Sequence, residues 1–388
     1  MQKSPQSPIK DLLKVQREMF SEKHRLPETL PLPKTLTEAL HSSGVRANLP
    51  LDDCLMKVVF SNKEASTLYG VGHSNTPIIR YKYDTEKLIC RSRVEIPRCD
   101  WIGEDKWGKI WVVALGSEQK ILKFNSMLYF EEFYDIPIKS ETIVYPWANC
   151  CTFDSLKTKL YFPFGMNKIG VLTIHKEGSL DDEEESPKKK EDKSASITVL
   201  KDTVSRISAF DMSITADNGR LVIDLGARSI FVIDLQGGPS MEEHIDASKE
   251  KLSSPLCLTN PYFVLFSGKE RHSPIVSLYR LKNLQLQLIS SLVFESSPQT
   301  NEIVVAMRIL ETNLGVDRVL VATSHRRLYV VQITSKGVMK KEAEFDLSIP
   351  GRGKIEQGVR TLYAKNQYAL FFTDNKDKTN TVVKFIGF

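Results

Sequence analysis

The sequence predicts an all-β fold, a seven-bladed β-propeller with a short, partly helical N-terminal extension. First, a hairpin-like unit recurs seven times, starting near residues 68, 110, 160, 221, 263, 319 and 369. Second, the steps between copies lie near the 40–50 residues that a four-stranded propeller blade needs. Third, no helical pattern separates the units, which argues against a parallel βαβ arrangement.

Each unit consists of an apolar run, a short polar or glycine-containing turn, and a second run with alternating apolar residues. A β-sandwich or an up-and-down barrel would also give many short strands, but not readily seven units with the same internal order. Radial repetition hides strand edges between neighbouring blades. The units span residues 67–83, 109–124, 160–174, 221–235, 263–281, 319–333 and 369–386.

The two ends of the repeat region predict how the ring closes. The seventh unit stops just before Phe388, so no residues follow it to form the outermost strand of that blade. We expect a segment within Gly44–Leu51 to supply this strand, and Cys54–Ser61 to form the innermost strand of the first blade. The first and last blades would then share one sheet.

Residues 1–50 read as an N-terminal arm, and residues 51–388 as the propeller domain. Within the arm, Ile9–His24 has near-helical apolar spacing, and Thr35–Glu38 forms a capping box ahead of a second short helix. Residues 177–194 are dominated by charged side chains and cannot bury enough apolar surface to stay ordered. We interpret them as a disordered loop inserted before an outer strand at Ile197–Leu200.

Composition limits the class of protein. The chain is 41% hydrophobic and 26% charged, and no run of about 18 apolar residues indicates a membrane span. No apolar signal segment follows Met1, and the six cysteines are irregularly spaced, as in a reducing compartment. These features favour an intracellular protein, cytoplasmic or nuclear. The net charge of +5 is too mild to indicate nucleic acid as a partner.

Several turns carry a recognisable pattern. Asp105-Lys106-Trp107-Gly108-Lys109-Ile110-Trp111-Val112 reads D-x-x-G-x-I-W-V, and Phe153–Phe162 reads like F-x-P-D-G-K-x-L-Y with Leu156 and Lys157 in place of Asp-Gly. Ile214–Ile223 is similar. These units resemble the propeller repeats of NHL, YVTN and SMP-30/gluconolactonase-type proteins. The Trp-Asp and Gly-His marks of WD40 repeats are missing.

The SMP-30-like resemblance implies an alternative function, a divalent-metal-dependent lactonase or esterase. Those enzymes hold a cation in the central channel through Glu, Asn and Asp ligands, and Asn149 and Asp211 occupy the matching Asn and Asp positions. Met56 and its neighbours replace the Glu, and Cys99 replaces the other Asn. A site with two of four ligands gone would be degenerate, and Asn or Asp at strand starts also bond to backbone in turns. We therefore predict no metal or other cofactor.

The turns inside the seven repeated hairpins emerge on one face of a propeller, and they are rich in basic residues. These turns contain nine basic residues, two of which are Lys376 and Lys378 in the seventh unit. They contain four acidic residues, Glu118, Glu270, Asp374 and Asp377. This balance predicts a contact with an acidic or phosphorylated segment of a partner protein, centred near Arg326 and Arg327, unless these are ordinary polar turn residues. The candidate partner-binding residues are Lys120, Lys168, Arg228, Lys269, Arg271, Arg326 and Arg327.

Three serines fit kinase recognition patterns in segments that should be accessible. Ser7 and Ser186 precede proline with a basic residue downstream, and Ser179 precedes two aspartates. No nucleophile elbow, phosphate-binding loop or dinucleotide turn is present in the sequence. The sequence therefore predicts a non-catalytic protein–protein interaction scaffold, a phosphoprotein and a subunit of a larger complex, with the lactonase reading as the alternative.

Overall fold

The computed structural model describes most of the strands and tight turns of the chain. It covers residues 45–48, 57–71, 77–83, 88–96, 99–114, 119–136, 151–164, 168–175, 194–202, 211–224, 229–237, 240–244, 253–270, 272–296, 302–313, 315–325, 327–346, 357–364, 367–373 and 381–387. This part of the chain is all-β and contains no helix. Within it there is accordingly no helix that is long and apolar enough to cross a membrane. The helices predicted before residue 45 and the insertion at 177–193 lie outside the described residues.

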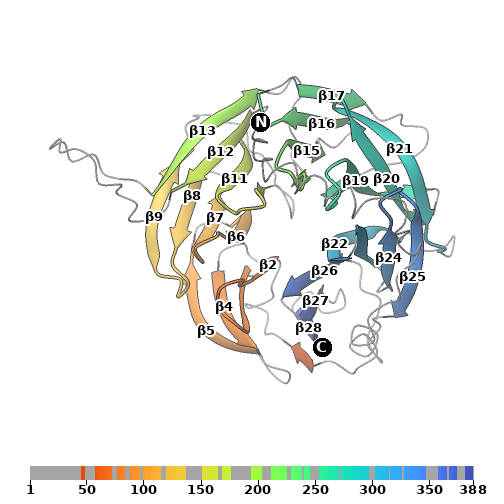
Figure 1. Ribbon diagram of the computed structural model, residues 1–388. Helices are drawn as coiled ribbons and strands as arrows, with labels where there is room; N and C mark the ends of the chain where they lie inside the picture. Colours follow the sequence, from red (N-terminus) through yellow and green to blue (C-terminus); the bar gives the residue numbers. More distant parts are fainter. Residues whose placement is uncertain are drawn as a thin grey trace, which may run out of the picture.

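The described strands form seven four-stranded antiparallel sheets. Figure 1 shows the sheets set around a common centre like the blades of a propeller, with one edge strand of each sheet at the rim. In six sheets the strands follow in chain order from the centre outward, so each sheet comes from one continuous stretch of sequence. This is the architecture that the repeat spacing predicts.

The first three sheets, each given from its innermost strand outward, have the following bounds. They contain β2 (Lys57–Phe60), β3 (Thr67–Val71), β4 (Pro77–Tyr83) and β5 (Leu88–Glu95); β6 (Trp101–Glu104), β7 (Ile110–Ala114), β8 (Lys120–Phe124) and β9 (Phe130–Asp135); and β10 (Thr152–Phe153), β11 (Lys159–Phe164), β12 (Lys168–Ile174) and β13 (Ala195–Asp202).

The remaining sheets continue around the ring in the same order. They contain β14 (Asp211–Ile214), β15 (Arg220–Asp224), β16 (Ser229–Asp234) and β17 (Ser240–His244); β18 (Ser253–Cys257), β19 (Phe263–Glu270), β20 (Ser273–Lys282) and β21 (Gln285–Val293); β22 (Val304–Asn313), β23 (Val316–Thr323), β24 (Arg327–Ile333) and β25 (Met339–Asp346); and β26 (Gln357–Ala364), β27 (Gln367–Thr373), β28 (Thr381–Gly387) and β1 (Val45–Asn48).

The seven predicted hairpins are the second and third strands of the seven sheets, which confirms that interpretation of the repeat. These strands are covered by a neighbouring sheet on each side. The second strands in particular are therefore rich in continuous apolar runs. Every residue of β7 and of β23 is buried, for example.

The last sheet joins the two ends of the repeat region. Its outermost strand is β1, which pairs antiparallel with β28 from Val45 opposite Phe385 to Asn48 opposite Val382. The prediction that residues within 44–51 supply this strand is confirmed. Its innermost strand, β26, contacts β22 on one side and β2 on the other, and Figure 1 shows β1 beside β28 near the C-terminus.

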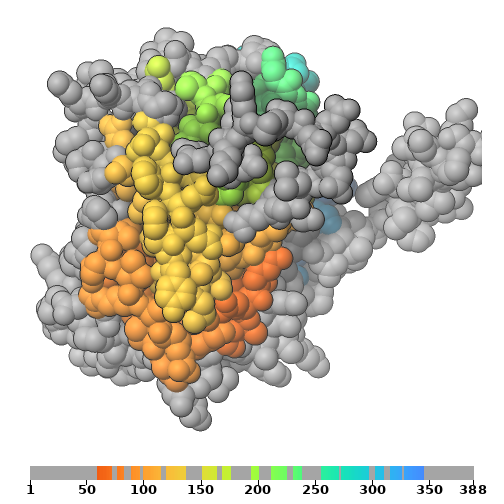
Figure 2. Space-filling model, turned by 90° about the vertical axis from the view of Figure 1, so that its left-hand side faces the viewer, coloured from red at the N-terminus to blue at the C-terminus, as the bar shows by residue number. Residues whose placement is uncertain are grey.

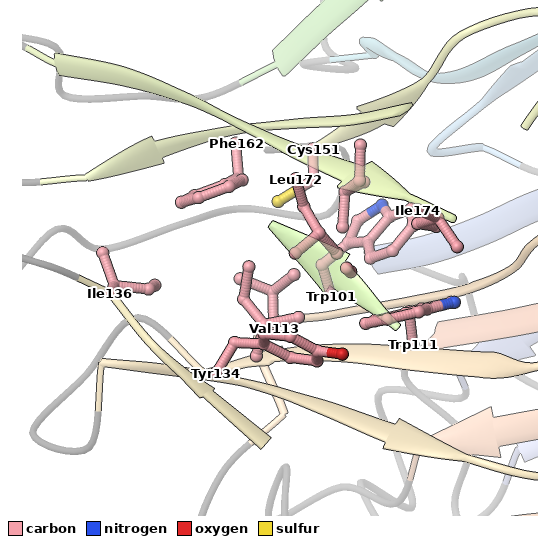
Figure 3. Packing of buried hydrophobic residues seen from close by; sticks show 12 residues of the cluster. Trp101, Trp111, Val113, Tyr134, Ile136, Cys151, Phe162, Leu172 and Ile174 are labelled. Atoms are coloured by element: carbon pink, nitrogen blue, oxygen red, sulfur yellow. The ribbon is translucent and has the colours of Figure 1, made fainter. Parts of the chain in front are cut away.

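Hydrophobic side chains fill the spaces between neighbouring sheets. Between the second and third sheets, Trp101, Trp111 and Tyr134 pack against Phe162 and Leu172 from the next sheet (Figure 3). The Trp101 ring meets the Phe153 ring edge-on, with centroids 5.3 Å apart. These interfaces fix the angle between adjacent sheets and hold the turns at both ends of the strands in place.

Antiparallel pairing places the turns on two opposite faces of the ring. We call the connections between first and second strands the inner turns, and those between second and third strands the middle turns. The third-to-fourth turns share the face of the inner turns. The two surfaces considered below are accordingly the inner-turn face and the middle-turn face.

Candidate functional site

The inner turns of three consecutive sheets share one design. An oxygen-bearing side chain opens each turn, at Asp105, Asp154 and Thr215, and the residue three positions later has a positive φ. The φ values are +85° at Gly108, +55° at Lys157 and +56° at Asn218. Only glycine adopts this left-handed region without strain. Lys157 therefore holds a conformation that is costly for its residue type, at the place where the pattern has glycine.

Asp105 shows what the D-x-x-G-x-I-W-V pattern does physically. Its Oδ1 accepts hydrogen bonds from the backbone N–H groups of Trp107 (2.8 Å) and Lys109 (2.9 Å). Its Oδ2 accepts one from the indole Nε1 of Trp111 at 2.7 Å. The side chain is buried, and this burial raises its pKa, although the three N–H donors act in the opposite direction. The Asp105 carboxylate of this turn thus serves the fold, because both of its oxygens accept hydrogen bonds from within the motif.

Hydrogen bonds also join each inner turn to the next sheet. Glu104 accepts from the Ser61 hydroxyl and from the Asn62 N–H of the first sheet. The Lys106 N–H donates to the Lys157 carbonyl at 3.2 Å. Asn218 accepts from the Ser155 N–H at 2.9 Å and donates to its hydroxyl at 2.7 Å.

The same kind of contact continues through the fourth, fifth and sixth sheets. The Cys257 N–H donates to the Ser213 hydroxyl at 3.0 Å. Thr259 donates to Asp317 through both its hydroxyl and its N–H. Five consecutive sheet junctions are therefore bridged by polar contacts as well as by apolar packing, so the ring is a rigid platform for its turns.

The predicted basic residues lie at the middle turns where the structure describes them. Lys120, Lys168 and Arg327 each begin a strand beside a middle turn, Lys269 is the last but one residue of β19, and each of the four is half-buried. The Lys120 ammonium lies 5.3 Å from the centre of the Phe133 ring. Arg228, Arg271 and Arg326 lie outside the described residues. The described bases belong to four different sheets and therefore do not form one compact cluster.

Arg327 is engaged inside the protein. Its guanidinium pairs with Glu302, whose carboxylate also accepts from Thr323 and Ser296, and its Nη1 donates to the Glu295 carbonyl at 2.7 Å. Burial alone would raise the pKa of Glu302, but the hydrogen bonds from Arg327, Thr323 and Ser296 outweigh it and lower the pKa. Arg327 thus balances the negative charge of the buried Glu302 carboxylate. Replacing Arg327 would leave that charge without its cationic partner.

The outer strands add acidic residues to the middle-turn face. Asp135 is the register partner of Lys120, Asp202 that of Lys168, and Asp346 that of Arg327. A count restricted to the turns omits these aspartates, because they lie about fifteen or more residues further along the chain. Lys269 lies on β19, the second strand of its sheet, so its register partner is Pro274 on β20 and not a residue of the outer strand. The acid beside it in the sequence is Glu270, the exposed last residue of β19.

Of the two residues proposed as metal ligands, the structure describes one, Asp211. Asp211 begins β14, an innermost strand, whereas Asn149 lies outside the described residues. Burial lowers the pKa of Arg308, and the charge of Asp211 opposes that shift, so the two groups interact electrostatically. A guanidinium near Asp211 competes with a metal ion for the carboxylate. The described residues contain no group of three His, Cys, Asp or Glu side chains that could hold a metal.

Sequence reasoning missed the engaged acids. Glu104, Glu302 and Asp317 are buried and accept hydrogen bonds from other segments, and only a three-dimensional arrangement shows which donors reach them. For Asp105 a signal existed, since an acidic residue three positions before glycine is typical of a side chain that caps its own turn. The predicted phosphorylation sites Ser7, Ser179 and Ser186 lie outside the described residues.

Known structures resemble this fold at low sequence identity. No family model and no curated protein matches the chain. The β-propeller domain of Cps50 (Swd1) from Myceliophthora thermophila has a TM-score of 0.56 and 11% identity, over 87% of this chain and 99% of that chain. A putative 6-phosphogluconolactonase from Bacteroides uniformis has a TM-score of 0.54 and 9% identity, over 75% and 85% of the two chains.

A periplasmic gluconolactonase from Pseudomonas aeruginosa has a TM-score of 0.51 and 13% identity, again over 75% of this chain and 85% of that chain. Proteins this dissimilar in sequence share a fold without necessarily sharing a function. Two of these three proteins are described as lactonases, and the third is described only as a β-propeller domain. Together with the sheet arrangement, these comparisons show that the chain has a β-propeller fold of the kind that its repeats resemble.

Proposed function

We propose that this protein is a non-catalytic scaffold that binds other proteins through the turns of a closed, seven-bladed ring. The observation that carries the proposal is the use of polar side chains at the inner turns. Asp105, Asp154 and Asp317 hold turns or adjacent sheets together. Such a ring keeps its exposed turns in fixed relative positions, which lowers the entropic cost of binding a partner across several of them.

The proposed contact is an acidic or phosphorylated segment of a partner, bound on the middle-turn face. The β19–β20 hairpin is the centre that we propose for it, because the sequence places two bases there, Lys269 and Arg271, around the single acid Glu270. Arg326 and Arg327 were expected at the centre from the sequence alone. Arg327 serves this purpose less well, since its guanidinium already compensates Glu302.

The test compares charge reversal at this hairpin with a matched control. A phosphoserine-containing acidic peptide is titrated into Lys269→Glu/Arg271→Glu and into Lys340→Glu, an exposed base on β25. The hairpin variant should lose at least about tenfold in affinity, more at low salt than at high salt, and the control should not. Equal affinities would refute the middle-turn contact. Arg327→Glu is unsuitable here, because a folding defect would mimic lost binding.

Other parts of the proposal follow from the sequence. Residues 51–388 would form one propeller domain, to which the arm at 1–50 contributes β1, with the charged insertion at 177–194 as a disordered loop between strands. Phosphate on Ser7, Ser179 or Ser186 would add charge outside the ring and regulate a partner contact. We further propose an intracellular protein that acts as a subunit of a larger complex.

The alternative function is a metal-dependent lactonase, favoured by the resemblance to gluconolactonase-type repeats. It would place Asn149 and Asp211 on a cation in the central channel. The interaction of Asp211 with Arg308 weighs against it. The distinguishing experiment is elemental analysis of the purified protein after dialysis. A stoichiometric divalent cation that Asp211→Ala releases would favour the lactonase over the scaffold.

A further inference from the structure

The inner-turn face, opposite the proposed middle-turn contact, carries a second and more compact surface. It joins the inner turns of the first three sheets. We define the inner-turn platform as Lys63, Lys106, Trp107, Leu156 and Lys157. Figure 2 shows the first-sheet residues near 60, in red-orange, against the orange and yellow surface of the second sheet.

Direct contacts hold the members of the platform beside one another. A Cβ added at Gly108 would lie 3.0 Å from Cγ of Lys63, so the stem of this lysine crosses the second turn. The Lys106 N–H donates to the Lys157 carbonyl at 3.2 Å, which joins the second turn to the third. Asp105 fixes the backbone of Trp107, and Asp154 fixes the turn that carries Leu156.

Two large apolar side chains stand on these fixed turns. Trp107 is 36% exposed and Leu156 is 59% exposed, and both occupy the third position of their turn. Exposed apolar residues scattered singly are normal on a protein surface. Here they sit on neighbouring turns joined by a hydrogen bond, so they form one feature. Tryptophan on a rigid turn is the residue type most often found as an energetic anchor of protein interfaces.

The charges of the platform that a ligand can reach are all positive. Lys63 and Lys106 are exposed, and among the described residues no ion pair engages their ammonium groups or that of Lys157. The acids of the same turns, Glu104 and Asp105, are 1% exposed and already accept hydrogen bonds from the protein. A partner therefore meets free ammonium donors but no free carboxylate.

The electrostatics of Lys157 agree with this geometry. Burial lowers the pKa of Lys157, and the nearby charge of Lys63 lowers it further, although Glu104 and Asp105 act against the shift. An anion bound near Lys63 and Lys157 would therefore favour the charged form of Lys157. A carboxylate that reached both ammonium groups would gain two charge-assisted hydrogen bonds.

We propose that the inner-turn platform binds an acidic segment of a partner protein that carries two adjacent large apolar side chains. These apolar side chains pack on Trp107 and Leu156, and flanking carboxylates pair with Lys63, Lys106 and Lys157. Charge complementarity and the two apolar residues together select this occupant. A purely polar polyanion would leave Trp107 and Leu156 unused, and a purely apolar segment would leave three ammonium groups unpaired.

The probe is a fluorescently labelled nine-residue peptide of aspartates and glutamates around a central Leu-Phe pair, titrated by fluorescence anisotropy. Lys63→Glu/Lys106→Glu should weaken binding at least about tenfold, and Trp107→Ser about as much. Raising salt from about 50 to 300 mM should weaken binding to the unaltered protein more than to the charge-reversed variant. The same peptide with alanines at its two apolar positions should bind about tenfold more weakly.

Lys336→Glu is the matched control, because Lys336 is an exposed lysine in the third-to-fourth turn of the sixth sheet, on the same face. It should leave the affinity unchanged. Equal loss in Lys336→Glu and Lys63→Glu/Lys106→Glu would overturn the proposal, as would an unaffected Trp107→Ser. So would a peptide that binds only after residues 181–193 are deleted, since the chain's own acidic run would then be the occupant.

This outcome is separable from that of the middle-turn contact. Lys269→Glu/Arg271→Glu alters the opposite face and should leave binding of the Leu-Phe peptide unchanged. If that variant alone loses the peptide, the inner-turn platform is not the binding site. If Lys63→Glu/Lys106→Glu alone loses it, the inner-turn proposal stands whatever happens at the middle turns.

Discussion

Substitution of Gly103 by alanine probes the packing between the second and third sheets. An added Cβ would lie 2.1 Å from Cη2 of Trp101 and 2.8 Å from Cε2 of Phe153. Carbon atoms in ordinary contact are about 3.5–4.0 Å apart, so the Trp101 ring would have to retreat by more than 1 Å. It cannot do so freely, because it packs against Phe153 and the buried residues of the next sheet.

Two opposing free-energy terms decide the size of the effect. Overpacking a close-packed core costs about 1–3 kcal/mol. Replacing glycine where φ is not positive returns about 0.4–1 kcal/mol by restricting the unfolded chain. We expect Gly103→Ala to lower the free energy of unfolding by about 1–2 kcal/mol, measured by urea denaturation followed by tryptophan fluorescence and circular dichroism.

A second background separates this clash from a general effect of alanine. In Trp101→Leu, the smaller side chain leaves room for the added methyl group, so Gly103→Ala should cost less there or stabilise. The double-mutant cycle should give a coupling energy of about 1 kcal/mol or more. An equal cost in both backgrounds, or no cost in the parent protein, would refute the packing argument.

Four other perturbations test separate contacts. Asp105→Ala should lower the free energy of unfolding by about 1–3 kcal/mol, because the buried indole N–H of Trp111 loses its acceptor; an unchanged urea midpoint contradicts this. The lowered pKa of Glu302 means that its contribution is complete above its usual 4.5 and is lost as pH falls through the lowered value. The stability gap between the parent protein and Glu302→Gln, measured by urea titration at pH 7 and about pH 3, should therefore shrink on acidification. Deleting residues 1–50 removes β1 and should lower the melting temperature, whereas deleting 1–44 keeps Val45–Asn48 and should not; equal melting temperatures would contradict closure by β1. Excising Asp181–Lys193 should leave folding intact, because the His175 N–H still donates to the Ser194 carbonyl at the base of the loop; a lost thermal transition would show a structural role.

The repeat could be predicted because the middle strands of each sheet are buried on both sides. Stretches such as Ile110–Ala114 and Val319–Ala322 are buried and apolar throughout, and that leaves a strong pattern in the sequence. The innermost strands leave a weaker pattern of apolar residues in the sequence. Thr152–Phe153 is only two residues long, and β14 begins with the charged Asp211. Such strands could be located only by their place between recognised hairpins.

The charge of each face could not be predicted, because a sequence does not show which charges remain accessible. Glu104-Asp105-Lys106 is acidic as a tripeptide, yet both acids are buried and bonded while the lysine is exposed. In the same way, Arg327 reads as an exposed turn base but pairs with Glu302, twenty-five residues earlier. Burial and long-range partners decide these cases, and neither follows from local spacing.

Closure of the last sheet by β1 has a consequence for synthesis of the chain on the ribosome. Val45 leaves the exit tunnel long before Phe385, its register partner, has been made. At about 5–20 residues per second, β1 stays without its pairing strand for tens of seconds. During that time the earlier sheets can stack, but the first one lacks its final neighbour on one side. A nascent chain of this protein therefore exposes two unmatched surfaces at once, and both disappear only when β26, β27 and β28 have emerged and paired.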